Sequence, residues 1–91
     1  MDSGQAWEAD TTSALRRRIG KSMTELGSTA NTDGCPDIWE LENGDVAVIG
    51  REATASHQDR LPAGVTIRHD ECLVIIPRSL LVAAKPDIPD A

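Results

Sequence analysis

The chain has 91 residues, the length of one small domain, and at this size folding buries only about 60 to 65% of the surface that an unfolded chain exposes. It contains no Phe and no Tyr, so its core must rest on aliphatic residues and two tryptophans, and a stability of about 5 kcal/mol is expected. The formal charge of −6 argues against a nucleic-acid binder that uses its whole surface, because neutralising phosphates requires a basic footprint.

The apolar runs and the cysteines set further limits. No apolar run approaches the roughly 20 residues of a membrane span, and the polar N-terminus lacks the apolar region of a signal peptide. Two cysteines, Cys35 and Cys72, are too few for a disulfide framework and form no CxxC pair. We therefore expect a cytoplasmic protein with reduced thiols and no membrane contact.

The N-terminal third predicts a helical arm and a linker. Its apolar residues follow the spacing of one helix face: Leu15, Ile19, Met23 and Leu26. This spacing predicts a helix over residues 14–26. The stretch 27–34 is rich in Gly, Ser, Thr and Asn, which is typical of a linker. We thus expect a helical N-terminal arm with its linker at residues 1–34, followed by a compact domain at residues 35–91.

The segment DIWELENGDVAVIG predicts a β-hairpin with a two-residue turn at Asn43 and Gly44. In that register Trp39 would lie opposite Val48, and both would face the core. The opposite face would be mostly acidic and would meet water. The residues expected on that second face are Glu40, Glu42, Asp45 and Ala47.

The rest of the chain predicts two short helices and two further strands. One helix is expected within residues 52–62 with Thr54 as its cap, and another after Ser79. Residues 64–68 and 72–76 read as strands, and the second should lie inside the sheet because it has no polar residue. The expected fold is α+β, a small three- or four-stranded antiparallel sheet with two short helices, preceded by the helical N-terminal arm.

Few residues could carry chemistry. Four residues match the number needed for a Cys2His2 zinc site: Cys35, His57, His69 and Cys72. Only His69 and Cys72 are close in sequence, so the spacing does not favour zinc. A Cys35 nucleophile would lack an orienting acid at a recognisable spacing, and the glycines form no phosphate-binding loop. We therefore predict no enzyme activity, no metal site and no cofactor.

Charge and one tryptophan indicate a surface for a partner protein. Residues 16–21 carry four positive charges, whereas residues 33–45 carry five acids and no base. Such runs are most often solvated faces, yet either could meet a charged partner. Trp7 lies outside every apolar pattern, as an exposed interface anchor would. The predicted partner-binding residues are Trp7, Arg16, Arg17, Arg18, Glu40, Glu42 and Asp45.

Three segments of the chain resemble short acidic proteins of actinomycete bacteria: CPDIWELENGDVAVIG, IIPRSLL and AKPDIP. The resemblance extends from Cys35 to the C-terminus and implies a cytoplasmic bacterial domain without a particular chemistry. A looser similarity links CLVIIPRSLL to the strand-then-helix element of AbrB-like swapped-hairpin DNA binders. It implies a transcriptional regulator, although this chain has few of the basic residues that such domains place on DNA.

The sequence thus predicts a small non-enzymatic protein-interaction module, an accessory or regulatory partner of a larger bacterial protein. The alternative is an AbrB-like regulator, or one that contacts DNA through the arm residues 16–18 and Lys21. An exposed sheet edge in so thin a fold also leaves room for a homodimer.

Overall fold

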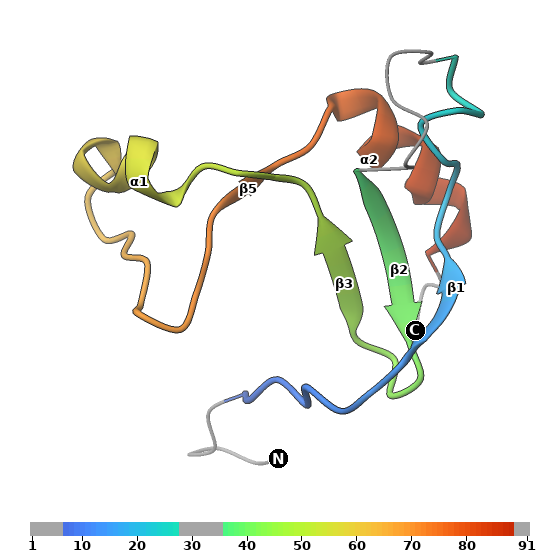
Figure 1. The fold of residues 1–91 in the computed structure, drawn as a ribbon, viewed down its shortest axis with the longest axis horizontal. Coiled ribbons are helices and arrows are strands. Elements are labelled where there is room, and N and C mark those ends of the chain that lie inside the picture. Colours follow the sequence, from blue (N-terminus) through green and yellow to red (C-terminus); the bar gives the residue numbers. More distant parts are fainter. Residues whose placement is uncertain (1–6, 28–35, 89–91) are drawn as a thin grey trace.

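The computed structural model describes residues 7–27 and 36–88 and confirms the α+β class (Figure 1). Three antiparallel strands form the main sheet in the order β1-β2-β3, and β4 and β5 form a second, two-stranded sheet. The strands are β1 (Leu15–Arg18), β2 (Asp37–Leu41), β3 (Val46–Ile49), β4 (Arg51–Glu52) and β5 (Val74–Ile75). The helices are α1 (Thr54–His57), η1 (Gln58–Arg60), α2 (Arg78–Ala84) and η2 (Lys85–Asp87). None of the helices in the described ranges is both long and apolar enough to cross a membrane.

The helix predicted over residues 14–26 is wrong, because residues 15–18 form strand β1 and residues 23–27 form turns. In β1, Arg17 lies opposite Glu40 of β2 and Arg18 lies opposite Trp39. The next residue, Ile19, donates its backbone N–H to β2 at 2.9 Å and is buried. Helix propensities differ by only a few tenths of a kcal/mol between ordinary residues, so these tertiary contacts override them. The domain boundary predicted between residues 34 and 35 falls within residues 28–35, which lie outside the described ranges.

The hairpin exists, but its loop has three residues where two were predicted. Gly44 donates its N–H to the Leu41 carbonyl at 3.0 Å, and the Leu41 N–H donates to the Asp45 carbonyl at 2.8 Å. Gly44 has a φ of +93°, the left-handed region that glycine adopts without strain. This is a type I turn followed by a glycine bulge, and it adds one residue to the loop.

The longer loop shifts the register by one residue and changes which side chains share a face. Trp39 lies opposite Ala47, whereas Ile38 lies opposite Val48. Because successive side chains of a strand alternate, Trp39 is on the face opposite to Val46 and Val48. The predicted pairing of Trp39 with Val48 on one core face is therefore wrong.

The second half of the chain differs from prediction in its caps and strands. Ala53 precedes α1 and Pro77 precedes α2, so neither Thr54 nor Ser79 is a cap. Residues 64–68 form no strand, and β5 pairs only with β4. Its side chains are exposed, which contradicts the prediction of a strand covered on both faces. An apolar run by itself cannot say whether neighbours will cover it.

The core is small and lies between the main sheet and α2. The buried apolar residues of the described ranges are Ile19, Ile38, Leu80 and Ala84. Gly20 permits this contact, because a Cβ at that position would lie 2.8 Å from the Ala84 backbone. Residues 51–75, which we call the β4–β5 arm, contain no buried residue and extend away from the main sheet in Figure 1.

Candidate interaction surface

The basic run of β1 and the acids of β2 form ion pairs with each other. Arg17 Nε lies 2.7 Å from Glu40 Oε1, and the Arg17 Nη2 also donates to the Asp87 carbonyl at 3.1 Å. The Glu40 side chain is only 15% exposed, so this carboxylate is largely covered by its partner. Cross-strand pairs of opposite charge stabilise antiparallel strands. Two of the charges predicted to meet a partner protein therefore already have an internal partner.

Arg18 forms the better covered ion pair of the sheet. Its Nε and Nη2 donate to the two Asp37 carboxylate oxygens at 2.8 and 3.1 Å, and Asp37 is buried. The same guanidinium lies 4.9 Å from the centroid of the Trp39 ring, as a cation–π contact requires. The hydrogen bonds that Arg18 donates to the Asp37 carboxylate raise the pKa of Arg18, which keeps it protonated. Trp39 is thus held beneath a cation, on the face of the sheet that α2 does not cover.

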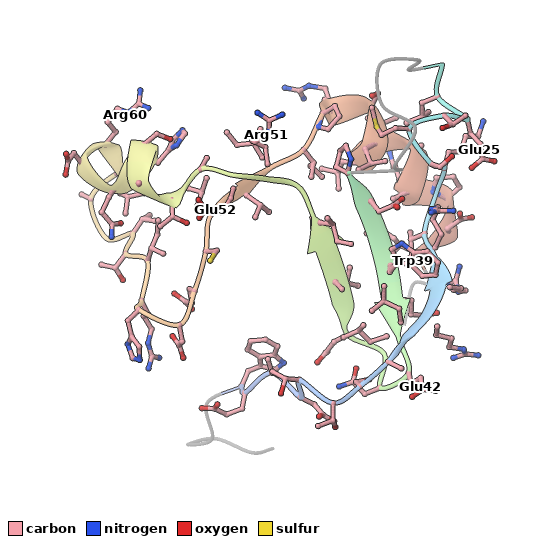
Figure 2. All side chains as sticks on the ribbon, viewed as in Figure 1. Glu25, Trp39, Glu42, Arg51, Glu52 and Arg60 are labelled. Carbon is pink, nitrogen blue, oxygen red and sulfur yellow. The ribbon has the colours of Figure 1, made fainter. Side chains whose placement is uncertain are left out.

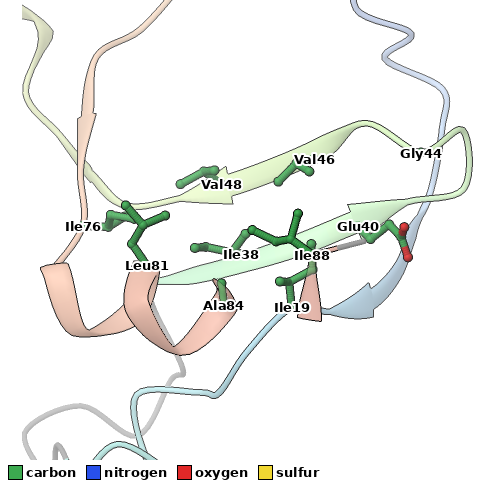
Figure 3. Close-up of a pocket in the computed structure, with 10 residues that line it drawn as sticks. All are labelled: Ile19, Ile38, Glu40, Gly44, Val46, Val48, Ile76, Leu81, Ala84 and Ile88. Carbon is green, nitrogen blue, oxygen red and sulfur yellow. The ribbon is translucent and has the colours of Figure 1, made fainter. Parts of the chain in front are cut away.

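An apolar groove of about 350 Å³ lies between the main sheet, α2 and the chain that follows it (Figure 3). Its lining residues are Ile19, Ile38, Glu40, Gly44, Val46, Val48, Ile76, Leu81, Ala84 and Ile88. Ile19, Ile38 and Ala84 form the buried floor. Glu40 is the one charged residue of the lining among the described residues, and its charge is paired with Arg17. The groove is therefore suited to an apolar occupant.

The walls of the groove expose their aliphatic side chains to solvent. Val46 and Leu81 are 52% and 56% exposed, and Val48 and Ile88 are similarly open. In Figure 3 these side chains project into the same space from β3, α2 and the segment after η2. Single exposed apolar residues need no explanation, but a cluster that lines a groove is typical of an interaction site. We call this lining the aliphatic groove.

The other predicted partner-binding residues lie outside the aliphatic groove. Trp7 is 72% exposed and lines a second pocket of about 300 Å³ together with the turn at residues 68–71. Arg16 is exposed on β1 and Glu42 is exposed at the hairpin turn. Asp45 is partly buried and accepts a long 3.5 Å hydrogen bond from Asn43. The structure thus brings Arg17, Arg18 and Glu40 to one sheet and leaves Trp7 at a separate place.

The described residues among those considered for a zinc site, His57, His69 and Cys72, form no metal-binding cluster. Within residues 7–27 and 36–88, no three His, Cys, Asp or Glu side chains lie close enough to hold a metal ion. Cys72 is exposed, and Cys35 lies outside the described residues. The Nδ1 of His57 is 3.0 Å from the Ala53 carbonyl, a contact within the turn that begins α1.

The aliphatic groove does not follow from the predicted register of the hairpin, which differs by one residue from the observed one. With the two-residue turn, Val46 and Val48 belong to the face of Trp39, where they would be buried. The available signal was the glycine at the third loop position, since a three-residue loop with glycine in the left-handed region is the next most common hairpin connection. A second signal was the run Leu80–Val82, because three consecutive apolar residues of a helix do not share one face.

A scan of family models, a search of curated proteins and a search of solved structures each gave no match to this chain.

Proposed function

We propose that this chain is a small non-enzymatic protein-interaction module that serves as an accessory or regulatory partner of a larger bacterial protein. The observation that carries this proposal is the aliphatic groove, an open and almost uncharged hollow on an otherwise acidic chain. Grooves of this kind accept the apolar face of an amphipathic helix, whose side chains at every third or fourth position fill the hollow. The buried floor gives such side chains a pocket rather than a flat surface.

Charge at the hairpin end of the groove favours a basic partner. Gly44 belongs to the groove lining, and the acids Glu42 and Asp45 flank it along the hairpin turn. Glu40 is paired with Arg17, whereas Glu42 and Asp45 have no ion-pair partner within the described ranges and can attract an approaching partner. Acids at the rim of an apolar site speed association with a positively charged surface and make its rate depend on salt.

The DNA-binding alternative draws less support from the same contacts. Arg17 and Arg18 are engaged by Glu40 and Asp37, whereas Arg16 and Lys21 are exposed and have no ion-pair partner within the described ranges. Phosphate contacts through the paired arginines would require breaking ion pairs that hold the sheet together. An electrophoretic shift at low salt that disappears steeply as salt rises would favour DNA over protein as the partner.

A matched pair of variants tests the proposed module. Leu81 lines the aliphatic groove and is 56% exposed, whereas the next residue, Val82, is 60% exposed and is absent from the lining. Leu81→Asp and Val82→Asp therefore introduce the same charge at equal exposure on one helix, inside and outside the groove. Neither change removes a buried side chain, so far-UV circular dichroism should show both variants folded.

The readout is capture of partner proteins from native lysate by the tagged chain, quantified by mass spectrometry. We expect a stoichiometric partner that is retained by the wild type and by Val82→Asp and lost with Leu81→Asp. A partner captured equally by all three proteins would contradict the groove as its binding site. If no protein is enriched over an unrelated acidic control, the module proposal fails.

A further inference from the structure

The two edges of the main sheet differ in how they are protected. The edge formed by β1 carries three consecutive arginines and a register irregularity between Leu15 and Arg17. Charged side chains and bulges are the usual devices that prevent an edge strand from pairing with another chain. The other edge, β3, consists of the residues VAVI, with no charge, no proline and no bulge within the strand. The β3 edge therefore has the features of an edge that pairs.

The hydrogen-bonding pattern shows which groups of β3 face outward. Ile38 of β2 accepts the Ile19 N–H from β1, so the even residues of β2 bond toward β1 and its odd residues toward β3. Ala47 lies opposite the odd residue Trp39 and therefore exchanges its bonds with β2. Val46 and Val48 consequently direct their N–H and C=O groups to the outer edge, where no described strand pairs with them.

The folded chain also buries little of its own apolar surface. Its radius of gyration is 15.1 Å, against about 12 Å for a compact domain of this length. The apolar residues of β3 are between 42 and 52% exposed at Val46, Val48 and Ile49. A second molecule at this edge would cover side chains that the chain itself leaves open.

We infer that β3 pairs antiparallel with β3 of a second copy of this chain, which joins two main sheets into one continuous six-stranded sheet. In the symmetric register the two-fold axis passes beside Ala47, and Val46 lies opposite Val48 of the partner subunit. This is the register in which all the outward groups of Val46 and Val48 are bonded within β3 alone. Opposed valines are favourable cross-strand pairs.

Charge at the ends of β3 favours a second copy over an unrelated strand. Asp45 precedes β3 and Arg51 follows it, and neither has an ion-pair partner within the described ranges. Figure 2 shows Arg51 at the far end of β3 from the hairpin turn that carries Glu42. Antiparallel pairing therefore places the acidic end of each copy beside the basic end of the other. A strand related by two-fold symmetry provides this complementarity at both ends at once.

The first test needs no substitution and has an internal control. Sedimentation equilibrium should show a mass that rises from 9.8 kDa toward twice that value with concentration. The range from about 1 µM to about 1 mM spans the affinities expected of a small interface. Over the same range, amide hydrogen exchange at Val46 and Val48 should slow about tenfold, in proportion to the dimer formed. The Ala47 amide is already hydrogen-bonded to β2 within the monomer. Its exchange should therefore slow no more than that of other amides in the main sheet.

The second test places charges at the two-fold axis. Ala47 lies on the face opposite the aliphatic groove, so Ala47→Lys and Ala47→Glu should leave capture of a groove partner intact. Each variant alone sets like charges against each other and should raise the dimer dissociation constant about tenfold or more. An equimolar mixture should recover the dimer, because Lys then faces Glu.

The following results would contradict the pairing of β3 with a second copy. A wild type that stays at 9.8 kDa throughout the range removes the dimer. A dimer unaffected by both charges, or one that their mixture does not restore, removes β3 as its contact. Unchanged exchange at Val46 and Val48 does the same without relying on any variant. Leu81→Asp lies outside this edge and should not alter the mass, so failure of the module proposal and failure of the dimer are separate results.

Discussion

Replacing Arg18 by methionine tests how much of the fold depends on one ion pair. Methionine keeps much of the aliphatic length of the side chain and removes its charge. The variant loses two hydrogen bonds to Asp37, at 2.8 and 3.1 Å, and the contact with the Trp39 ring. It also leaves a buried carboxylate without a partner, since Asp37 is only 7% exposed.

The expected loss follows from these contacts. Charge-assisted hydrogen bonds contribute about 1.5 to 3 kcal/mol, and we take about 2 kcal/mol because the Arg18 side chain is 35% exposed. The cation–π contact adds about 0.5 to 1 kcal/mol. Arg18→Met should therefore lower the free energy of unfolding by about 3 kcal/mol, which is more than half of the roughly 5 kcal/mol expected for so small a core.

Urea titration followed by far-UV circular dichroism at neutral pH measures this change. Arg17→Met is the matched control, because the Arg17 side chain is 43% exposed and a pair of that kind contributes about 0.5 to 1 kcal/mol. The double variant Arg18→Met with Asp37→Leu should recover much of the loss, since no buried charge then remains unpaired. A loss below about 1 kcal/mol for Arg18→Met, or a double variant less stable than the single one, would refute the reasoning.

Two further perturbations follow from the backbone and from one local hydrogen-bond pair. Gly20→Ala should cost about 3 kcal/mol in urea titration, because its φ is +80° and the new Cβ would lie 2.8 Å from the Ala84 backbone. Gly44→Ala is the control and should cost only about 1 kcal/mol, since the φ of Gly44 is also positive but no atom lies within 4 Å of the added Cβ. Equal losses of stability in the two variants would show that the contact between Gly20 and α2 is unimportant. The pKa of Glu25 is lowered because its carboxylate accepts the Ser22 N–H at 2.8 Å, while the Ser22 hydroxyl accepts the Glu25 N–H. A carboxyl group whose pKa is lowered in the folded state stabilises the fold above the ordinary glutamate pKa, and this contribution is lost as the pH falls through the pKa of the folded state. Glu25→Gln should therefore flatten the acid side of a plot of Tm against pH. An unchanged plot would contradict the role given to the Ser22–Glu25 hydrogen bonds.

The nature and order of most elements could be predicted from local sequence. Alternation on both sides of Asn43 and Gly44 specified a hairpin, and the composition specified a thin aliphatic core. Pro77 and Pro86 marked where the last helix is bounded, because the backbone restrictions of proline act within a few residues. The α+β class follows from such local signals, which each segment carries by itself.

Tertiary structure alone decided that residues 15–18 form a strand, and it alone decided the register of the hairpin. The register in turn decides which side chains line the aliphatic groove. The residues of β1 suit a helix or a strand almost equally, and pairing with Glu40 and Trp39 of β2, more than 20 positions away, selects the strand. One extra loop residue moved Val46 and Val48 to the face of the aliphatic groove, since side chains alternate with a period of two. Local preferences differ by tenths of a kcal/mol, whereas contacts between distant segments contribute several, and those contacts exist only once the chain has folded.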